Sequence, residues 1–322
     1  MTMMGTSSRN PVIAIAGATG HLGTWLVESF LSKDLFPQPP GLVLLSRRHT
    51  PRTKAWETLG AQVRILDEGG DIGELTDALE GADVLINAIS SSGMQLSDDL
   101  VHALPKTTVK LYFPSEFGVD HTIHNFSIPE WDGKKKHFEL TQRVLAGSEV
   151  LLCRLFVGLF LHAGIGPWFG LHTSKNVYQG IGSLDRPISY TDLGDVAKVI
   201  SLLAKEVLDG HKVPQNLRIG GTHSSFRRTA EAMEEAGAGT IELRSVELEG
   251  FRNKALGRPY NERDAIVFLR FLMGDGGINY RHKDEGGLGN DNETINPNQK
   301  YFKWKTMEQF ARETGGQPNA KV

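Results

Sequence analysis

The stretch "VIAIAGATGHLG", residues 12–23, joins an apolar run directly to three glycines spaced three residues apart. The run predicts a buried strand, and the segment after the glycines has helical spacing. Gly17 allows the tight turn between them, Gly20 lets the backbone approach a pyrophosphate, and Gly23 lets the helix pack closely on the strand. A helix beginning near His21 presents free N–H groups and the positive end of its dipole to that pyrophosphate. The stretch therefore predicts a dinucleotide site.

Five further apolar runs extend this pattern through the first half of the chain. They lie at 42–46, 62–66, 82–89, 109–115 and 150–156, and segments with helical spacing lie at 21–33, 53–59, 73–80, 95–104 and 131–146. Buried strands that alternate with helices are typical of parallel sheets covered on both faces. We predict an α/β fold with a doubly wound parallel Rossmann sheet. This context favours a dinucleotide site over the alternative, glycines that serve only a tight turn.

The end of the second predicted strand indicates which dinucleotide is bound. Ser46, Arg47 and Arg48 lie there, and no acidic residue takes the place of the Asp or Glu that binds the ribose 2′-OH in NAD-preferring folds. A guanidinium group pairs with a 2′-phosphate instead, so we predict NADPH. The alternative is an ordinary solvated basic loop.

The end of the fourth predicted strand, residues 87–90, is expected to pass the nicotinamide ribose. With the turn after the fifth strand, it completes the predicted cofactor-binding set: Gly17, Thr19, Gly20, His21, Leu22, Gly23, Ser46, Arg47, Arg48, Asn87, Ala88, Ile89, Ser115 and Glu116.

Composition restricts the class of protein. The 322-residue chain has a formal net charge of −3, which argues against nucleic acid or an anionic membrane as its main partner. No apolar run approaches the roughly 20 residues of a membrane helix, and residues 1–10 lack a hydrophobic signal segment. The single cysteine, Cys153, fits a reducing compartment and an inert place in a buried strand. We expect a cytoplasmic globular protein, a monomer or homodimer.

The second half of the chain is less regular. Helices are predicted from near Thr191 or Asp192, after one of Thr222, Ser224 or Ser225, within 262–277 and within 306–316. Residues 284–300 are rich in Gly and Asn and predict an exposed loop. We predict an NADPH-binding Rossmann domain at 11–156. Residues 157–322 are expected to form a smaller, mainly substrate-binding part, with some segments returning to the Rossmann core.

Three segments carry a family resemblance: "GATGHLG" at 17–23, "LYFPSEFGVD" at 111–120 and "EWDGKKKHFELTQRVL" at 130–145. They resemble the isoflavone reductase-like group of the NmrA-like atypical short-chain dehydrogenases, which includes phenylcoumaran benzylic ether and pinoresinol–lariciresinol reductases. The likeness runs in order over roughly residues 11–205. It implies a monomer-like Rossmann core, NADPH, reduction of an aromatic or conjugated small molecule, and a place in secondary metabolism.

The resemblance also implies an acid–base lysine. The wider short-chain dehydrogenase class uses a Tyr-x-x-x-Lys pair, whereas the reductases that this chain resembles use a lysine early in the helix after "PSEFG". Here "KKK" occupies that region, and the distance to "LLCRLF" favours Lys135, with Lys136 next and Lys134 as a control. A lysine near a cationic nicotinamide could exchange a proton near neutrality. The alternative is a solvated helix face.

Ser115 and Glu116 are expected at the carboxyl edge of the sheet, where ligands of such folds bind, although a purely structural turn is an equal alternative. Residues His121 and His124 are expected to lie in a loop, where they could face the substrate, and no metal site is predicted. Apolar side chains at 156–169 are expected to form a pocket wall, with Phe156 in the core and Trp168 and Phe169 in a mobile lid. The predicted substrate contacts are Phe117, His121, Phe160, Trp168 and Phe169.

These features favour an NADPH-dependent reductase that transfers hydride to a hydrophobic conjugated, carbonyl or benzylic molecule, phenylpropanoid- or polyketide-like. The alternative is a dinucleotide-sensing regulatory protein of the NmrA type, which binds cofactor and a protein partner without turnover. A redox-neutral isomerase or epimerase is a third reading. The acid–base lysine favours the enzyme, because a regulator is free to lose it.

Overall fold

The computed structural model describes residues 9–32, 35–36, 38–66 and 71–320. These residues form two compact units. The first comprises the described parts of Met1–Ser115 together with Leu140–Cys153 and Ile200–Val213, and the second comprises Glu116–Glu139, Arg154–Val199 and the described part of Pro214–Val322. Residues 116–139 thus lie in the second unit, although the predicted Rossmann domain at 11–156 included them. The predicted assignment of cofactor and substrate to the two parts stays a prediction.

The first unit is built on a six-stranded parallel sheet with the order β3-β2-β1-β4-β5-β6. Its strands are β1 (Val12–Ala16), β2 (Gly41–Ser46), β3 (Gln62–Ile65), β4 (Val84–Asn87), β5 (Leu111–Phe113) and β6 (Leu151–Leu152). The order reverses beside the central strand β1, which is the place where doubly wound folds bind dinucleotides. This confirms the predicted Rossmann sheet.

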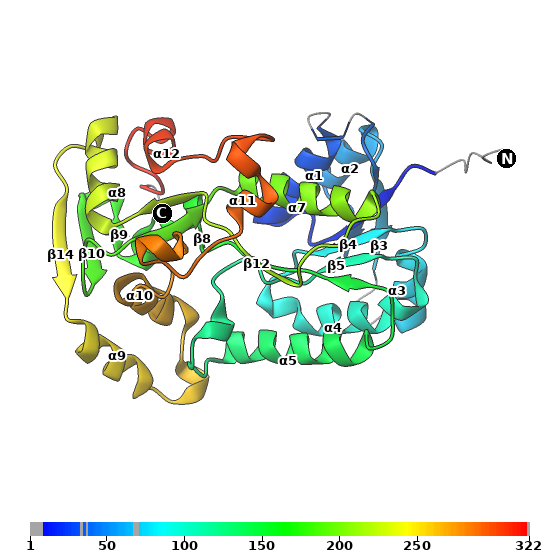
Figure 1. The fold of residues 1–322 in the computed structure, drawn as a ribbon, viewed down its shortest axis with the longest axis horizontal. Helices are drawn as coiled ribbons and strands as arrows, with labels where there is room; N and C mark the ends of the chain where they lie inside the picture. Colours follow the sequence, from blue (N-terminus) through cyan, green and yellow to red (C-terminus); the bar gives the residue numbers. More distant parts are fainter. Residues whose placement is uncertain (1–8, 33–34, 37, 67–70, 321–322) are drawn as a thin grey trace. The chain divides into compact units, whose positions relative to one another are not determined.

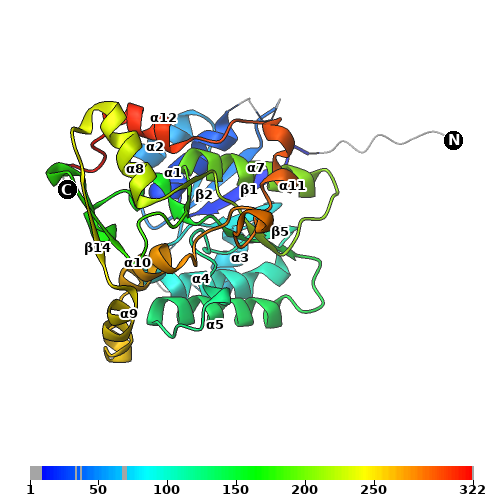
Figure 2. The ribbon, with the colours of Figure 1, turned by 60° about the vertical axis from the view of Figure 1, so that its left-hand side comes forward.

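Helices cover both faces of this sheet. Helices α1 (His21–Leu31) and α2 (Pro51–Thr58) lie on one face, and α3 (Ile72–Ala78) and α4 (Met94–Ala103) lie on the other (Figures 1 and 2). Ile13, Ala14 and Ile15 of β1 are all 0% exposed, because one side of the strand faces each helical layer. Two of the unit boundaries fall within helices, one in α5 (Pro129–Val144) and one in α7 (Leu193–Leu208).

The second unit contains three small sheets. Strand β10 (Val177–Ile181) pairs with β9 (Leu171–His172) and β14 (Glu242–Val246), and β11 (Ile188–Thr191) pairs with β8 (Leu159–Phe160) and β13 (Thr222–Ser224). Strand β7 (Arg154–Phe156) pairs with β12 (Asn216–Arg218). The helices are α6 (Leu161–Gly164), α8 (Phe226–Met233), α9 (Leu248–Leu256), α10 (Ala265–Asp275), α11 (Asn292–Ile295) and α12 (Met307–Glu313). Helices α8 and α10 both contact β10, and one apolar cluster joins them.

Capping residues and a glycine visible in the sequence mark several helix ends of the second unit. The Ser225 side chain accepts a hydrogen bond from the Arg228 N–H and caps α8, and Asp192 accepts from the Gly194 N–H at the start of α7. Helix α10 ends at Gly276, whose φ of +98° is the left-handed conformation that glycine adopts without strain.

Two predictions were wrong. Residues 150–156 form two strands, because the Cys153 N–H donates to Tyr112 whereas the next N–H, of Arg154, donates to Gln215. Residues 284–300 are not simply an exposed loop: they include α11, and Asn296 is 0% exposed. The Asn296 side chain is buried because it replaces backbone partners: its amide donates to the Phe302 carbonyl oxygen at 2.8 Å and accepts from the Tyr301 N–H at 3.0 Å.

Candidate cofactor and substrate sites

Two glycines hold the turn between β1 and α1 by close packing. Gly17 has a φ of +82°, and a Cβ on it would lie 2.6 Å from the carbonyl oxygen of Ala88. A Cβ on Gly23 would lie 2.1 Å from the carbonyl oxygen of Gly17. No side chain fits at either position without moving the backbone, so the turn itself requires both residues.

Gly20 is less crowded than either of these glycines, and it is exposed. Among the described residues, a Cβ on Gly20 would meet only the carbonyl oxygen of Gly17, at 3.2 Å. Gly20 is the N-cap of α1, and within the described chain no side chain caps this helix and its first turn carries no acid. The first N–H groups and the positive end of the helix dipole lie at an exposed position where a phosphate fits.

Positive charge gathers at the end of β2. Arg47 and Arg48 are exposed, and the hydroxyl of Ser46 donates to the carbonyl oxygen of Arg48 at 2.8 Å, which fixes the loop. The guanidinium of Arg52 donates to the Thr24 hydroxyl on α1 at 3.0 Å. A third cation therefore lies against the first turns of α1. The guanidinium groups of the three arginines are donors of the kind that bind a phosphate dianion.

The ends of β4 and β5 are tied together by side chains. Asn87 is 0% exposed; its amide donates to the Tyr112 hydroxyl at 3.2 Å and accepts from the Ile89 N–H at 3.1 Å. The Ser115 hydroxyl donates to the Ile89 carbonyl oxygen at 2.6 Å. These predicted cofactor residues meet at the carboxyl edge of the sheet, where the Asn87 side chain and the Ser115 hydroxyl already occupy the N–H and the carbonyl oxygen of Ile89.

Three polar side chains form a buried group in the second unit, which we call the Glu116 cluster: Glu116, His121 and Arg154, exposed by 3%, 1% and 5%. The His121 Nε2–H donates to the Glu116 carboxylate at 2.8 Å, and Nη1 of Arg154 lies 3.8 Å from the other carboxylate oxygen. Burial raises the pKa of Glu116, but the His121 hydrogen bond and the charges of Lys134, His121 and Arg154 outweigh it, so the pKa lies below its ordinary value. Glu116 is therefore a carboxylate at neutral pH.

The loop that carries Glu116 and His121 is fixed at several points. The Val157 N–H donates to Gly118 at 2.8 Å, and the Asp120 carboxylate accepts from Nε of Arg218 at 2.8 Å. The Asp120 N–H donates to the Tyr280 hydroxyl at 2.7 Å. The loop is therefore rigidly held, and His121, predicted to contact substrate, lies beneath its surface.

The three consecutive lysines of α5 point in different directions, because successive helical residues are rotated by about 100°. Nζ of Lys134 donates to the carbonyl oxygen of Glu116 at 3.5 Å. Nζ of Lys135 instead donates to the Asp132 carboxylate at 3.1 Å and to the Phe126 carbonyl oxygen at 3.2 Å, and Lys136 is exposed. The structure thus brings Lys134, the residue predicted as the control, beside Glu116.

One tyrosine has the spacing of the short-chain dehydrogenase pair, since Tyr301 is followed four residues later by Lys305. No helix carries this segment in the described chain, and Nζ of Lys305 is paired with Asp192 at 3.4 Å and Glu313 at 3.0 Å. The pair is a structural contact of the second unit.

The predicted lid is a packed turn. Phe169 is 7% exposed and belongs to the main apolar cluster of the second unit, and the Trp168 indole N–H donates to the Ala163 carbonyl oxygen at 2.7 Å. Phe117 is 9% exposed, whereas Phe160 is half-buried. The aromatic rings at 168–169 have partners in the core of the second unit, which local sequence does not reveal, and a lid role for this turn stays a prediction.

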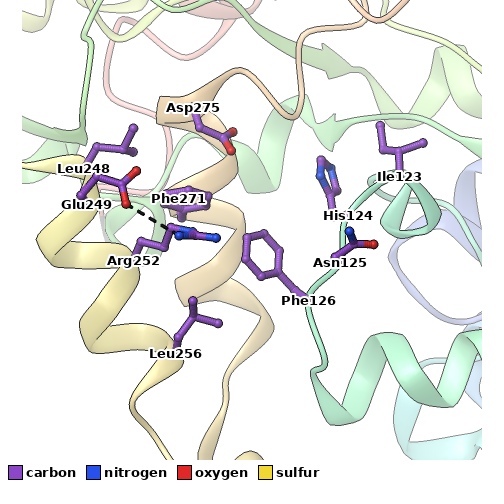
Figure 3. Close-up of a pocket in the computed structure, with 10 residues that line it drawn as sticks. All are labelled: Ile123, His124, Asn125, Phe126, Leu248, Glu249, Arg252, Leu256, Phe271 and Asp275. Carbon is purple, nitrogen blue, oxygen red and sulfur yellow. Dashed lines mark ion pairs between the residues drawn. The ribbon is translucent and has the colours of Figure 1, made fainter.

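A cavity of about 430 Å³ lies elsewhere in the second unit, between the loop 123–126, α9 and α10 (Figure 3). Sequence reasoning missed it, although the amphipathic pattern at 262–277 and the aromatic residue after His124 were available signals. Its lining residues are Ile123, His124, Asn125, Phe126, Leu248, Glu249, Arg252, Leu256, Phe271 and Asp275.

The cavity combines aromatic walls with a few polar groups. The rings of Phe126 and Phe271 meet edge to face with centroids 5.7 Å apart. Burial lowers the pKa of His124 despite its hydrogen bond to Gly277, so the imidazole is neutral at pH 7. Its Nε2–H donates to the Gly277 carbonyl oxygen, which leaves Nδ1 as an acceptor. Such a lining suits a small aromatic molecule with a hydroxyl or carbonyl group.

The described residues meet the requirements neither of a metal site nor of a membrane-spanning helix. Among them, no three His, Cys, Asp or Glu side chains are grouped so that they could hold a metal ion. None of the helices in the described ranges is both long enough and apolar enough to cross a membrane.

The sequence profile of the NmrA-like family matches residues 9–311. No curated protein matches the chain in sequence. Among solved structures, AtPrR2 with NADP+ and (+)-pinoresinol is 17% identical, with a TM-score of 0.73 and coverage of 96% of this chain and 99% of that one. Isoflavone reductase is also 17% identical, with a TM-score of 0.72 and coverage of 95% and 99%. The NADPH-dependent quinone oxidoreductase QOR2 of Escherichia coli is 20% identical, with a TM-score of 0.62 and coverage of 94% and 98%.

Proposed function

The chain belongs to the NmrA-like family, and from this premise we propose that it is an NADPH-dependent reductase that transfers hydride to a hydrophobic conjugated, carbonyl or benzylic small molecule. The open backbone at Gly20, beside an uncapped helix N-terminus among the described residues, carries the proposal. NADPH, when bound, supplies the hydride. Similar folds described with NADP+ or NADPH support the choice of cofactor.

The cofactor contacts follow from the donors in the first unit. In the proposal, the N–H groups at the start of α1 bind the pyrophosphate, and Arg47 and Arg48 bind the 2′-phosphate. The backbone at 88–89 and Ser115 line the nicotinamide end. In the proposal, Gly20 admits the pyrophosphate because it lacks a side chain.

Reduction of a conjugated or carbonyl group leaves an anion that needs a proton, and we assign its supply to Lys134. Among the described residues, the one hydrogen bond that the Lys134 ammonium donates is long, 3.5 Å to the Glu116 carbonyl oxygen, so the ammonium is weakly held. Lys135 is engaged by Asp132, and this ion pair disfavours the sequence-based choice. The acid–base role predicted from sequence for Lys135 or Lys136 stays a prediction, which single variants test.

The cavity of the second unit is our candidate for the hydrophobic part of the substrate. Its volume of about 430 Å³ accommodates one or two aromatic rings. A neutral imidazole with a free acceptor at Nδ1 suits a hydroxyl donor on such a ring. Leu256→Trp should fill the cavity and raise KM for the substrate, with NADPH affinity unchanged as the control.

The function is tested by NADPH consumption. The purified protein is given NADPH and a panel of enones, quinones, benzylic ethers and phenylpropanoids, and loss of nicotinamide absorbance is followed with product analysis. Turnover of at least one compound with NADPH preferred over NADH supports the reductase. Tight NADPH binding without any turnover would favour the regulatory protein, and no binding of either cofactor would overturn the proposal.

The lysine assignment is tested by Lys134→Met, Lys135→Met and Lys136→Met, which keep the aliphatic stem and remove the ammonium. General acid groups contribute about 10²–10⁴-fold, so kcat should fall by that order in Lys134→Met alone. Lys136→Met is the matched control, because Lys136 is exposed on the same helix. A large loss in Lys135→Met with none in Lys134→Met would restore the sequence-based choice.

A further inference from the structure

The Glu116 carboxylate has more cations around it than one negative charge requires. His121 occupies one carboxylate oxygen at 2.8 Å, and Arg154 lies 3.8 Å from the other. Lys134 is also close enough for its charge to favour the ionised carboxyl group, yet its Nζ is placed on the Glu116 main-chain oxygen instead. Among the described residues, Lys134 thus lies beside a buried carboxylate without forming an ion pair with it.

We propose that His121 is a positioning residue that occupies the Glu116 carboxylate and so prevents this carboxylate from capturing the Lys134 ammonium. The inference rests on the proposed role of Lys134 as proton donor. A buried carboxylate that loses a hydrogen-bond partner must find another cation or donor, because an unpaired charge in a low dielectric is strongly disfavoured. Lys134 is the flexible cation within reach, since its stem has four rotatable carbons.

Capture by the carboxylate would harm a proton donor in two ways. It would turn Nζ toward the buried carboxyl group, away from the exposed side, and it would hold the proton in a strong charge-assisted hydrogen bond. Arg154 is the competing cation, since its Nη1 lies 3.8 Å from the carboxylate and has no hydrogen-bond partner among the described residues. Its guanidinium is held by a 2.7 Å bond from Nε to Asn216 and lies 3.6 Å from the centroid of the Phe138 ring, so it moves less freely than the Lys134 ammonium. His121 is therefore the group that leaves Lys134 available.

The contacts of His121 allow a substitution that removes its hydrogen bond to Glu116 and keeps its aromatic packing. Its Nδ1 is buried and has no hydrogen-bond partner among the described residues, so Glu116 is the polar group that depends on this ring. The ring otherwise packs on Trp131 and Phe156, with centroids 6.4 and 6.1 Å away. Phenylalanine keeps this aromatic packing and removes the donor, whereas glutamine keeps a donor near the position of Nε2.

The experiment compares His121→Phe and His121→Gln in the full chain, with kcat, KM and NADPH affinity measured for each. We expect kcat to fall about 10- to 100-fold in His121→Phe, as displaced catalytic groups do, with KM and NADPH affinity within a factor of about three. His121→Gln should recover most of kcat. In a Glu116→Gln background, His121→Phe should cost little more, because no carboxylate remains to capture the lysine. Full activity of His121→Phe, equal damage by both variants, or an undiminished loss in the Glu116→Gln background would overturn the inference.

A crystal structure of His121→Phe supplies a readout that does not depend on turnover. It should show Nζ of Lys134 within ion-pair distance of the Glu116 carboxylate, and Nζ left on the Glu116 carbonyl oxygen would refute capture. The two proposals can therefore fail separately. If the Glu116 carboxylate captures Lys134 in the variant crystal but the wild-type protein shows no turnover, only the proposed function is refuted. If turnover needs Lys134 but the crystal shows no capture, only this inference is refuted. If His121→Phe does not fold, the structure of His121→Asn, which lacks a donor at that reach, decides in the same way.

Discussion

The replacement Gly20→Val tests the phosphate site at its centre. Gly20 has φ −74° and ψ 176°, an extended conformation that any residue adopts. A Cβ there would meet only the Gly17 carbonyl oxygen, at 3.2 Å, among the described residues, so a side chain requires this carbonyl to shift by a few tenths of an ångström. The proposed pyrophosphate leaves no space for a side chain, because it must reach the N–H groups directly behind this position. The variant should therefore fold and fail to bind.

The magnitudes separate binding from stability. Hydrogen bonds to charged groups contribute about 1.5–3 kcal/mol each, and loss of one or two should weaken NADPH binding by about 2–4 kcal/mol, or roughly 30- to 900-fold. The free energy of unfolding should change by less than about 1 kcal/mol, since glycine replacement at a compatible conformation also restricts the unfolded chain. Gly17→Ala is the contrasting variant: left-handed strain and the 2.6 Å approach to Ala88 should cost about 2–5 kcal/mol of stability.

Two measurements on the same samples decide the matter. Isothermal titration gives NADPH affinity, and urea unfolding followed by circular dichroism gives stability. Wild-type affinity in Gly20→Val would show that the phosphate does not approach this turn. Loss of both affinity and stability would show that Gly20 is a structural glycine like Gly17, and the placement of the cofactor would then have no support from this residue.

Three other outcomes follow from the described structure. Replacing Arg47 and Arg48 by alanine should weaken NADPH binding by a few kcal/mol and leave NADH nearly unchanged; equal losses would contradict the 2′-phosphate site. Burial raises the pKa of the Cys153 thiol to about 12, so a disulfide reagent at pH 8 should label it only after unfolding. Burial, with the charge of Arg281, lowers the pKa of His223 to about 4, so the unfolded state binds the extra proton first as the pH falls. The free energy of unfolding should therefore fall by about 1–3 kcal/mol between pH 6.5 and pH 4. Urea unfolding at each pH measures this fall, which should be smaller in His223→Asn.

The sequence by itself determined the parallel sheet and the place of the glycine-rich turn after its first strand. Each strand of the first unit is a short apolar run, because it is buried on both faces, and each helix that follows has its own spacing and caps. The three glycines could be interpreted one by one, since a turn, an exposed close approach and a helix packing on a strand each demand a residue without a side chain. Ser225 and Gly276 likewise act within one turn of their own helices.

Only the tertiary structure decided which side chains around residue 116 meet. The Glu116 cluster joins Glu116 and His121 of one loop to Arg154 at the start of β7, and neither the pairing nor the burial of a histidine has a periodic signal. The choice among Lys134, Lys135 and Lys136 likewise depends on about 100° of rotation per residue relative to a neighbour that is distant in sequence. Local propensity acts over a few residues, whereas these contacts are set by packing between segments.

The same reason explains the pocket. Aromatic residues at 156–169 suggested a substrate wall, but Phe169 lies in the core and Trp168 is bonded to a local carbonyl oxygen. The cavity lies instead where the loop 123–126 meets two helices more than a hundred residues further along the chain. Apolar side chains look alike in sequence whether they fill a core or line a cavity, because the difference is the space left after packing, and that space exists only once the chain has folded.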